Sequence, residues 1–122
     1  MMILIAEDNV GLRYFLWRVL RDDGQRVIAA SDGEEALRAS RAHPGPIDLV
    51  LADFEMPRMN GLKLCRIIAA KRPETKVVIM SGDPNAGEQC ALARLPFLQK
   101  PFQLSAIREM IQNMFGHVAS GE

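Results

Sequence analysis

The stretch DLVLADFEMP, residues 48–57, decides the fold. Residues 49–52 are apolar at every position, whereas a strand with one face in water alternates apolar and polar residues. This run therefore predicts a strand of a parallel sheet that is covered on both faces. The run ends on Asp53, with Glu55 two residues later, although acids are rarely buried without a partner. Asp53 is therefore expected at the rim of a core.

Five apolar runs predict strands, at residues 2–6, 26–30, 47–52, 76–80 and 97–99. The segments between them have helical spacing, which is clearest in Leu12, Phe15, Leu16, Val19 and Leu20. Gly24 is predicted to end that helix, and further helices are predicted after the cap residue Asp32, over about 61–72 and over about 104–115. This alternation predicts a parallel sheet with helices on both faces and right-handed crossovers.

The composition indicates one soluble domain without a broad charge bias. A chain of 122 residues is about the size of one domain, and 15 basic residues balance 15 acidic ones. This balance does not favour nucleic acid or an anionic membrane as a partner. Cys65 and Cys90 lack the spacing of a zinc or redox motif, so reduced, packed thiols are expected. The apolar runs are shorter than the ~20 residues of a membrane span and no basic leader precedes them, so we expect a cytoplasmic protein.

Polar residues follow four of the five predicted strands. They are Glu7 and Asp8 after the first strand, Asp53 and Glu55 after the third, Ser81 after the fourth and Lys100 after the fifth. In such sheets the carboxyl ends of the strands meet at one edge, where functional groups collect. Each residue alone fits an ordinary loop, but together they predict one site.

Three carboxylates at one edge require a compensating cation. Two carboxylates 4 Å apart repel by roughly 4 kcal/mol at an effective dielectric constant near 20. Oxygen ligands favour a hard ion such as Mg²⁺. Lys100 and Ser81 offer a positive charge and a hydroxyl donor to a phosphoryl group, which a carboxylate can accept covalently. The residue types therefore predict a site that accepts a phosphoryl group.

Four segments resemble, in order, the receiver domain of bacterial two-component response regulators, and they extend over nearly the whole chain. They are ILIAEDN (3–9), DLVLADFEMPRMNG (48–61), VVIMSGD (77–83) and PFLQKPF (96–102). The resemblance implies a flavodoxin-like three-layer α/β sandwich, with a five-stranded parallel sheet in the order 2-1-3-4-5 and five helices. It also implies a receiver domain over residues 1–118 and a C-terminal tail over residues 119–122.

The resemblance implies that Asp53 accepts a phosphoryl group from a phosphohistidine. Asp53 would need alignment rather than a base, because it would already be ionised. The Mg²⁺ ion, for which Mn²⁺ could substitute, would be held by Asp8 directly, Glu7 mainly through water, Asp53, and the backbone carbonyl of Glu55. The peptide bond between Lys100 and Pro101 is implied to be cis.

The resemblance also implies a switch. Ser81 would hydrogen-bond the phosphoryl oxygens and Lys100 would pair with them. On phosphorylation Ser81 would move toward the phosphoryl group and Phe97 would rotate inward, which would change the surface of helix four, strand five and helix five. The alternative is that Phe97 is an ordinary core residue.

The chain departs from the family pattern at two places. Between Ser81 and Lys100 it is a few residues shorter than typical members and is interrupted by Pro84, Gly87 and Pro96, so helix four is predicted to be short. A short helix four resembles receivers of hybrid histidine kinases or receivers that stand alone. The second departure is the acid Glu55. Its side chain either faces the phosphoryl site, where it would alter the lifetime of the aspartyl phosphate, or faces solvent.

The resemblance implies a histidine kinase or histidine phosphotransfer protein as phosphodonor, and an unknown protein as downstream target. Tyr14 and Trp17 lie away from the main apolar stripe of the first helix, among arginines, so they are candidates for docking the donor. The alternative is that Trp17 packs locally. No output segment follows the last predicted helix, so the chain is expected either to act through protein contacts or to be one module of a longer protein. Direct contact with nucleic acid or a membrane is not expected.

The leading hypothesis is a phosphorylatable signalling switch, either stand-alone or a module of a hybrid kinase. It is not expected to be an enzyme beyond assisting its own Mg²⁺-dependent phosphorylation and slow autodephosphorylation. A haloacid-dehalogenase phosphatase also uses an aspartate, Mg²⁺, a hydroxyl and a lysine, but there the nucleophile precedes the other acids, whereas Glu7 and Asp8 precede Asp53. An adaptor that never binds phosphate is disfavoured because no site residue has been lost.

Overall fold

The computed structural model describes residues 1–116, in which strands and helices alternate. The strands are β1 (Met2–Ala6), β2 (Arg26–Ala30), β3 (Leu49–Asp53), β4 (Lys76–Ser81) and β5 (Phe97–Gln99). The helices are α1 (Val10–Asp22), α2 (Gly33–Ala42), α3 (Gly61–Lys71), α4 (Pro84–Leu92) and α5 (Leu104–Phe115). Within residues 1–116, none of the helices has the length and apolarity to span a membrane. The predicted domain boundary at residue 118 and the tail at 119–122 lie outside the described residues.

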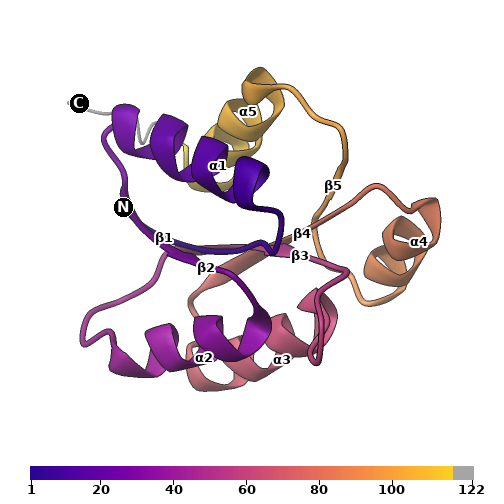
Figure 1. Ribbon diagram of the computed structural model, residues 1–122, viewed down its shortest axis with the longest axis horizontal. Coiled ribbons are helices and arrows are strands. Elements are labelled where there is room, and N and C mark those ends of the chain that lie inside the picture. The colour runs from indigo at the N-terminus through magenta and orange to yellow at the C-terminus, as the bar shows by residue number, and fades with distance from the viewer. Residues whose placement is uncertain (117–122) are drawn as a thin grey trace.

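The five strands form one parallel sheet in the order β2-β1-β3-β4-β5, as predicted. Helices α1 and α5 cover one face, α2 and α3 cover the other, and α4 lies beside β4 and β5 (Figure 1). This three-layer α/β arrangement confirms the predicted fold class. The strand order reverses at β1, and the carboxyl ends of β1 and β3 therefore flank the crevice where ligands bind in such folds.

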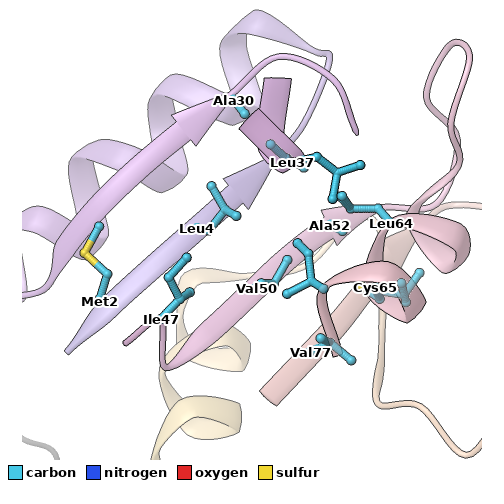
Figure 2. Packing of buried hydrophobic residues seen from close by; sticks show 14 of the residues in the cluster. Met2, Leu4, Ala30, Leu37, Ile47, Val50, Ala52, Leu64, Cys65 and Val77 are labelled. Carbon is cyan, nitrogen blue, oxygen red and sulfur yellow. The ribbon is translucent and has the colours of Figure 1, made fainter. Parts of the chain in front are cut away.

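Two apolar clusters, one on each face of the sheet, hold the layers together. On one face Leu4 and Val50 pack with Leu64 of α3 (Figure 2), and on the other Leu51 packs with Ile107 of α5. Neighbouring residues of a strand enter opposite clusters because side chains alternate between the two faces. The continuous apolar run in β3 follows directly, since both of its faces are covered. Each fully buried Leu or Ile contributes roughly 1.5–3 kcal/mol.

Side-chain caps fix where four of the helices begin. Asn9, Asp32, Asn60 and Asp83 each accept a hydrogen bond from a backbone N–H in the first turn of α1, α2, α3 and α4, respectively. Three of these caps come shortly after the carboxyl end of a strand, so they also position the loops around that edge of the sheet. Gly24 follows α1 with a φ of +90°, as its predicted role at the helix end requires.

Helix α4 has nine residues and is the shortest helix of the described part of the chain, which confirms the prediction of a short fourth helix. Pro84 is at its first position rather than before it. A proline is tolerated there because its missing N–H has no partner within the helix. The brevity of α4 therefore results from where the chain turns into β5 and not from an interruption by Pro84.

Three details of the sequence prediction are wrong. The fourth strand ends at Ser81 instead of residue 80. Phe15 is 42% exposed rather than part of the buried stripe. It lies about 100° round the helix from Leu16, which is fully buried against the sheet. The central strand begins at Leu49 instead of residue 47 and includes Asp53, because its pairing with β1 starts opposite Ile3.

Candidate functional site

The carboxyl ends of β1, β3, β4 and β5 bring the predicted polar residues to one edge of the sheet. We name this the carboxyl-edge site, made of Glu7, Asp8, Asp53, Ser81 and Lys100. One carboxylate oxygen from each of Glu7, Asp8 and Asp53 lies within 4.8 Å of the others. Glu7 is fully buried, Asp53 is 4% exposed and Asp8 is exposed. Water can therefore reach the cluster from the side of Asp8.

Three hydrogen bonds fix the orientation of Glu7. Its Oε2 accepts a hydrogen bond from the backbone N–H of Asn9 at 3.0 Å, and its Oε1 accepts one from Lys100 Nζ at 2.8 Å. Its backbone carbonyl accepts a hydrogen bond from the guanidinium of Arg13 at 2.9 Å. Both carboxylate oxygens of Glu7 are thus already bound by protein groups, and this buried charge is paired as burial requires.

Lys100 links two of the acids. Its Nζ lies 2.8 Å from Glu7 Oε1 and 3.2 Å from Asp53 Oδ1. Burial lowers the pKa of Lys100, but the hydrogen bond to Glu7 and the charges of Glu7 and Asp53 outweigh burial and raise the pKa above its ordinary value. Lys100 is therefore charged at neutral pH. The peptide bond between Lys100 and Pro101 is cis.

Asp53 is a buried acid with an incomplete set of hydrogen-bond partners. Burial, followed by the charge of Glu7, raises the pKa of Asp53 to about 7, although Lys100 opposes this shift. Its Oδ1 is buried and has no hydrogen-bond partner, because the contact with Lys100 has the distance of an ion pair without the angles of a hydrogen bond.

The donor set fits a hard divalent cation. A cation beside Asp53 would lower the pKa of this carboxyl and give the buried Oδ1 a partner. The candidate ligands, from Glu7, Asp8 and Asp53, are all carboxylate oxygens, which suit Mg²⁺ and Mn²⁺ better than a softer metal. One lysine against three acids leaves an excess of negative charge that such an ion would neutralise.

The side chain of Glu55 faces the carboxyl-edge site, which answers a question that the sequence left open. The buried Ser81 Oγ lies 2.8 Å from Glu55 Oε1 and 2.7 Å from Glu55 Oε2, and it donates its hydrogen to that carboxylate. Ser81 Oγ also accepts a hydrogen bond from the backbone N–H of Asp83 at 3.0 Å. Sequence reasoning missed Asp83, although its place two residues after Ser81 and directly before Pro84 is typical of a helix cap.

Gly61 was predicted only as the start of a helix, but it also supports Asp53. A Cβ at this position would lie 2.3 Å from the backbone oxygen of Asp53, so α3 can approach the end of β3 only with glycine. The Gly61 N–H donates to the carbonyl of Phe54 at 3.0 Å, and the Phe54 N–H donates to the carbonyl of Met80 at 2.8 Å. The loop after Asp53 is therefore tied to β4 at its start and returns to contact β3.

Phe97, at the start of β5, is half-buried and packs against the apolar cluster that contains Leu64. Its ring lies against α4 at Gly87, where an added Cβ would be 3.1 Å from Phe97 Cε2. The small residue at Gly87, which sequence reasoning treated only as a helix interruption, makes room for this ring. The side chain thus lies between β5 and α4.

Tyr14 and Trp17 form a stacked pair on α1, with ring centroids 5.8 Å apart. Tyr14 is 57% exposed, whereas Trp17 is half-buried and packs in part against the cluster that contains Ile107. The guanidinium of Arg21 lies 4.7 Å from the centroid of the Trp17 ring. Val10, Arg13, Tyr14, Trp17 and Ala29 line an apolar groove of about 310 Å³. Trp17 therefore contributes both to the core and to this surface.

A family model described as "Response regulator receiver domain" matches residues 3–112. The chain therefore belongs to the response regulator receiver family. Sensor kinase CckA of Brucella abortus is 33% identical over 115 residues, which cover 92% of this chain and 12% of that protein. The regulatory protein PdtaR of Mycobacterium tuberculosis is 33% identical over 113 residues, which cover 90% of this chain and 54% of that protein. This chain thus corresponds to one part of these longer relatives.

Solved structures show the same fold. The receiver domain of the hybrid histidine kinase CckA has a TM-score of 0.79 and 30% identity, with 93% of this chain and 97% of that chain covered. The response regulator TrrA of Thermotoga maritima, in complex with Mg²⁺-BeF, has a TM-score of 0.82 and 25% identity, with the same coverage of 93% and 97%. The CheY4 chemotaxis protein of Vibrio cholerae, at 22% identity and a TM-score of 0.81, supports the fold alone.

Proposed function

We propose that this receiver domain is a phosphorylation switch in which Asp53 takes a phosphoryl group from a phosphohistidine. The observation that carries the proposal is the state of Asp53, a buried carboxylate beside Lys100 with one oxygen that has no hydrogen-bond partner. A structural carboxylate would be paired, as Glu7 is. The proposal covers one receiver domain over residues 1–118.

Glu7, Asp8, Asp53 and the backbone carbonyl of Glu55 are the proposed ligands of Mg²⁺, for which Mn²⁺ could substitute. The closeness of the carboxylate oxygens of Glu7, Asp8 and Asp53 supports this set of ligands. A relative of this fold binds Mg²⁺ with the phosphoryl analogue BeF, which is consistent with it. When bound, the ion would neutralise charge on the phosphoryl oxygens. Asp8, the exposed acid, would contact it directly, and Glu7 would act mainly through water.

In the proposed transfer, an ionised carboxylate oxygen of Asp53 forms a bond to phosphorus while the bond between phosphorus and the donor imidazole breaks. The electron pair of that bond stays with the imidazole nitrogen. Lys100 pairs with the phosphoryl oxygens and Ser81 donates a hydrogen bond to them, which stabilises charge during transfer. The chain thus assists its own phosphorylation and slow autodephosphorylation and has no other substrate.

The proposed output is a change in the surface formed by α4, β5 and α5. Movement of Ser81 toward the phosphoryl group would change the space available to Phe97, which packs between β5 and α4. A protein target, still to be identified, would read this surface by contact. Lacking a hydroxyl, Phe97 would act through packing alone. Neither nucleic acid nor membrane is proposed as a direct partner.

The proposed donor is a histidine kinase or a histidine phosphotransfer protein that docks on α1 through Tyr14 and Trp17. The exposed Tyr14 and the adjoining apolar groove support this surface. To test it, phosphotransfer from a phosphorylated phosphotransfer domain is timed with wild type and Tyr14→Ala, with Phe15→Ala as an exposed aromatic control. Slower transfer to Tyr14→Ala alone is expected. Equal rates for all three proteins would remove Tyr14 from the docking surface.

The side chain of Glu55 is proposed to influence the lifetime of the aspartyl phosphate. Its carboxylate lies at the carboxyl-edge site, where its charge would affect the approach of water to the phosphoryl group. The half-life of the phosphorylated protein is compared between wild type and Glu55→Ala. A changed half-life is expected, and equal values would contradict this role.

Two settings fit the proposal: a stand-alone response regulator, and a receiver module of a hybrid kinase that feeds or drains phosphate. The short α4 and the similarity to the receiver of a hybrid kinase favour the second. The cytoplasm is the proposed location, since both cysteines are free thiols. Incubation with acetyl phosphate and Mg²⁺ tests the function. A stable adduct indicates a switch, turnover of added phosphomonoesters an enzyme, and neither of these an adaptor.

A further inference from the structure

The Ser81 hydroxyl has one hydrogen to donate, and in this structure Glu55 receives it. The distances from Ser81 Oγ to the two carboxylate oxygens of Glu55 are 2.8 and 2.7 Å. A hydroxyl that accepts other hydrogen bonds still has only one O–H to donate. A phosphoryl group on Asp53 would require the same hydrogen. The two anions therefore compete for one donor.

We propose that Glu55 is a built-in competitor for the Ser81 hydroxyl, which a phosphoryl group on Asp53 must displace. The proposal rests on the proposed function, because it assumes that Asp53 is the acceptor. Hydrogen bonds to a charged acceptor are about twice as strong as neutral ones. The hydrogen bond to Glu55 must break before Ser81 can donate to the phosphoryl group, and this opposes binding of the phosphoryl group. Glu55 is exposed, and its side chain can leave toward solvent without rearrangement of the core.

The same contact reaches the beginning of α4. Ser81 Oγ accepts a hydrogen bond from the Asp83 N–H at 3.0 Å, and the Asp83 side chain accepts one from the Asn85 N–H at 2.9 Å as the cap of α4. Glu55, Ser81 and Asp83 thus form a continuous hydrogen-bonded chain from the loop after β3 to α4. In the unphosphorylated protein, Glu55 fixes the rotamer of Ser81 and with it the junction between β4 and α4.

A double-mutant cycle tests the competition, with the complex of Mg²⁺ and beryllofluoride as the phosphoryl analogue. Its affinity is measured by ¹⁹F NMR for wild type, Glu55→Ala, Ser81→Ala and the double variant. Glu55→Ala is expected to tighten binding about tenfold when Ser81 is present. In the Ser81→Ala background the gain should fall to about twofold, because only the removed charge still matters. Equal gains in both backgrounds would overturn the proposal.

Two further variants separate charge from hydrogen bonding. Glu74→Ala removes an exposed acid in the turn before β4 and is expected to leave the affinity unchanged. Glu55→Gln removes the charge but keeps an oxygen that can accept a hydrogen bond from Ser81. Its affinity for beryllofluoride should therefore lie between those of wild type and Glu55→Ala. A gain for Glu55→Gln as large as that for Glu55→Ala would show that charge alone acts.

A measurement without ligand distinguishes failure of this proposal from failure of the proposed function. The amide exchange rate of Asp83 reports directly on its hydrogen bond to Ser81. Glu55→Ala is expected to lose protection at Asp83, whereas Glu74→Ala is not. If beryllofluoride binds none of the proteins, the proposed function is overturned. If protection at Asp83 is the same in wild type and Glu55→Ala, the role of Glu55 at this junction is overturned.

Discussion

At the amino ends of the strands, the polar side chains have hydrogen-bond partners within the protein, whereas at the carboxyl ends Asp53 has a buried oxygen that lacks one. Asp48 accepts from a backbone N–H at 2.7 Å, Thr75 donates to a backbone carbonyl at 2.6 Å, and Arg72 donates to three backbone carbonyls and a hydroxyl. At the opposite edge, Asp53 has a buried oxygen without a hydrogen-bond partner and lies beside the like charge of Glu7.

This contrast separates stability from function within one sheet. Satisfied polar groups stabilise the fold, and their removal leaves buried partners without hydrogen bonds. Unsatisfied and like-charged groups destabilise the protein by itself and persist where a ligand completes them. The amino edge should therefore behave as a structural element, and the carboxyl edge as a site whose energetic cost is relieved by binding.

The largest effect is expected from Arg72→Ala at the amino edge. The guanidinium of Arg72 bonds to the hydroxyl and carbonyl of Ser40 and to the carbonyls of Gly45 and His43. Its loss should reduce the free energy of unfolding by about 3 kcal/mol, measured by urea denaturation. The exposed Arg41 of α2 is the control, and Arg41→Ala should change little. A loss below about 1 kcal/mol for Arg72→Ala would contradict the contrast.

At the carboxyl edge, Asp53→Asn should instead stabilise the protein, and increasingly so at higher pH. The pKa of Asp53 is raised from 3.8 to about 7 on folding. Below pH 4 the carboxyl is protonated in both states, so the variant gains little. Between pH 4 and 7 only the unfolded state ionises, so wild type loses stability as the pH rises. A rise of this size in the pKa corresponds to about 4 kcal/mol. Because water reaches the site from the side of Asp8 and screens these charges, the advantage of Asp53→Asn above pH 7 should level off at about half of this, about 2 kcal/mol.

Thermal unfolding of both proteins at pH 4 and pH 8, without divalent ions, measures this difference. Asp22→Asn replaces an exposed acid of α1 and serves as the control. If Asp53→Asn is more stable than wild type by the same amount at both pH values, ionisation of the buried Asp53 carboxyl does not destabilise the folded protein. A decrease in stability would mean that Asp53 is a structural group like those of the amino edge.

The smallest expected effect is the stabilisation of wild type by Mg²⁺. An ion that binds only the folded protein at ten times its dissociation constant adds about 1.4 kcal/mol. The melting temperature should rise with Mg²⁺ in wild type, and much less in Asp8→Asn or Asp53→Asn. NaCl at the same ionic strength controls for screening by salt. An equal rise in all three proteins would place the ion elsewhere.

The fold could be predicted from the sequence because strands and helices alternate with clear periodicity. The apolar run of residues 49–52 specifies coverage on both faces, and this alone implies a parallel sheet. The rule that parallel strands align their carboxyl ends then brings Glu7, Asp53 and Lys100 together. Their proximity is a consequence of topology, which local sequence encodes well.

Other features could not be predicted, because they depend on how elements approach one another. The contact of Gly61 with the backbone of Asp53 and that of Gly87 with Phe97 arise from helix placement, which no periodicity encodes. The direction of the Glu55 side chain depends on the position of Ser81 on a neighbouring strand. Phe15 was misplaced because five apolar residues at helical spacing cover a wider arc than the sheet can bury.

The most direct test of the account is to locate the phosphoryl group chemically. Wild type and Asp53→Asn are incubated with acetyl phosphate and Mg²⁺ and then reduced with borohydride, which converts an aspartyl phosphate to homoserine. Peptide mass mapping should find homoserine at position 53 in wild type and at no position in the variant. Homoserine at position 8, or an unmodified Asp53 in wild type, would contradict the assignment of Asp53 as the phosphoacceptor.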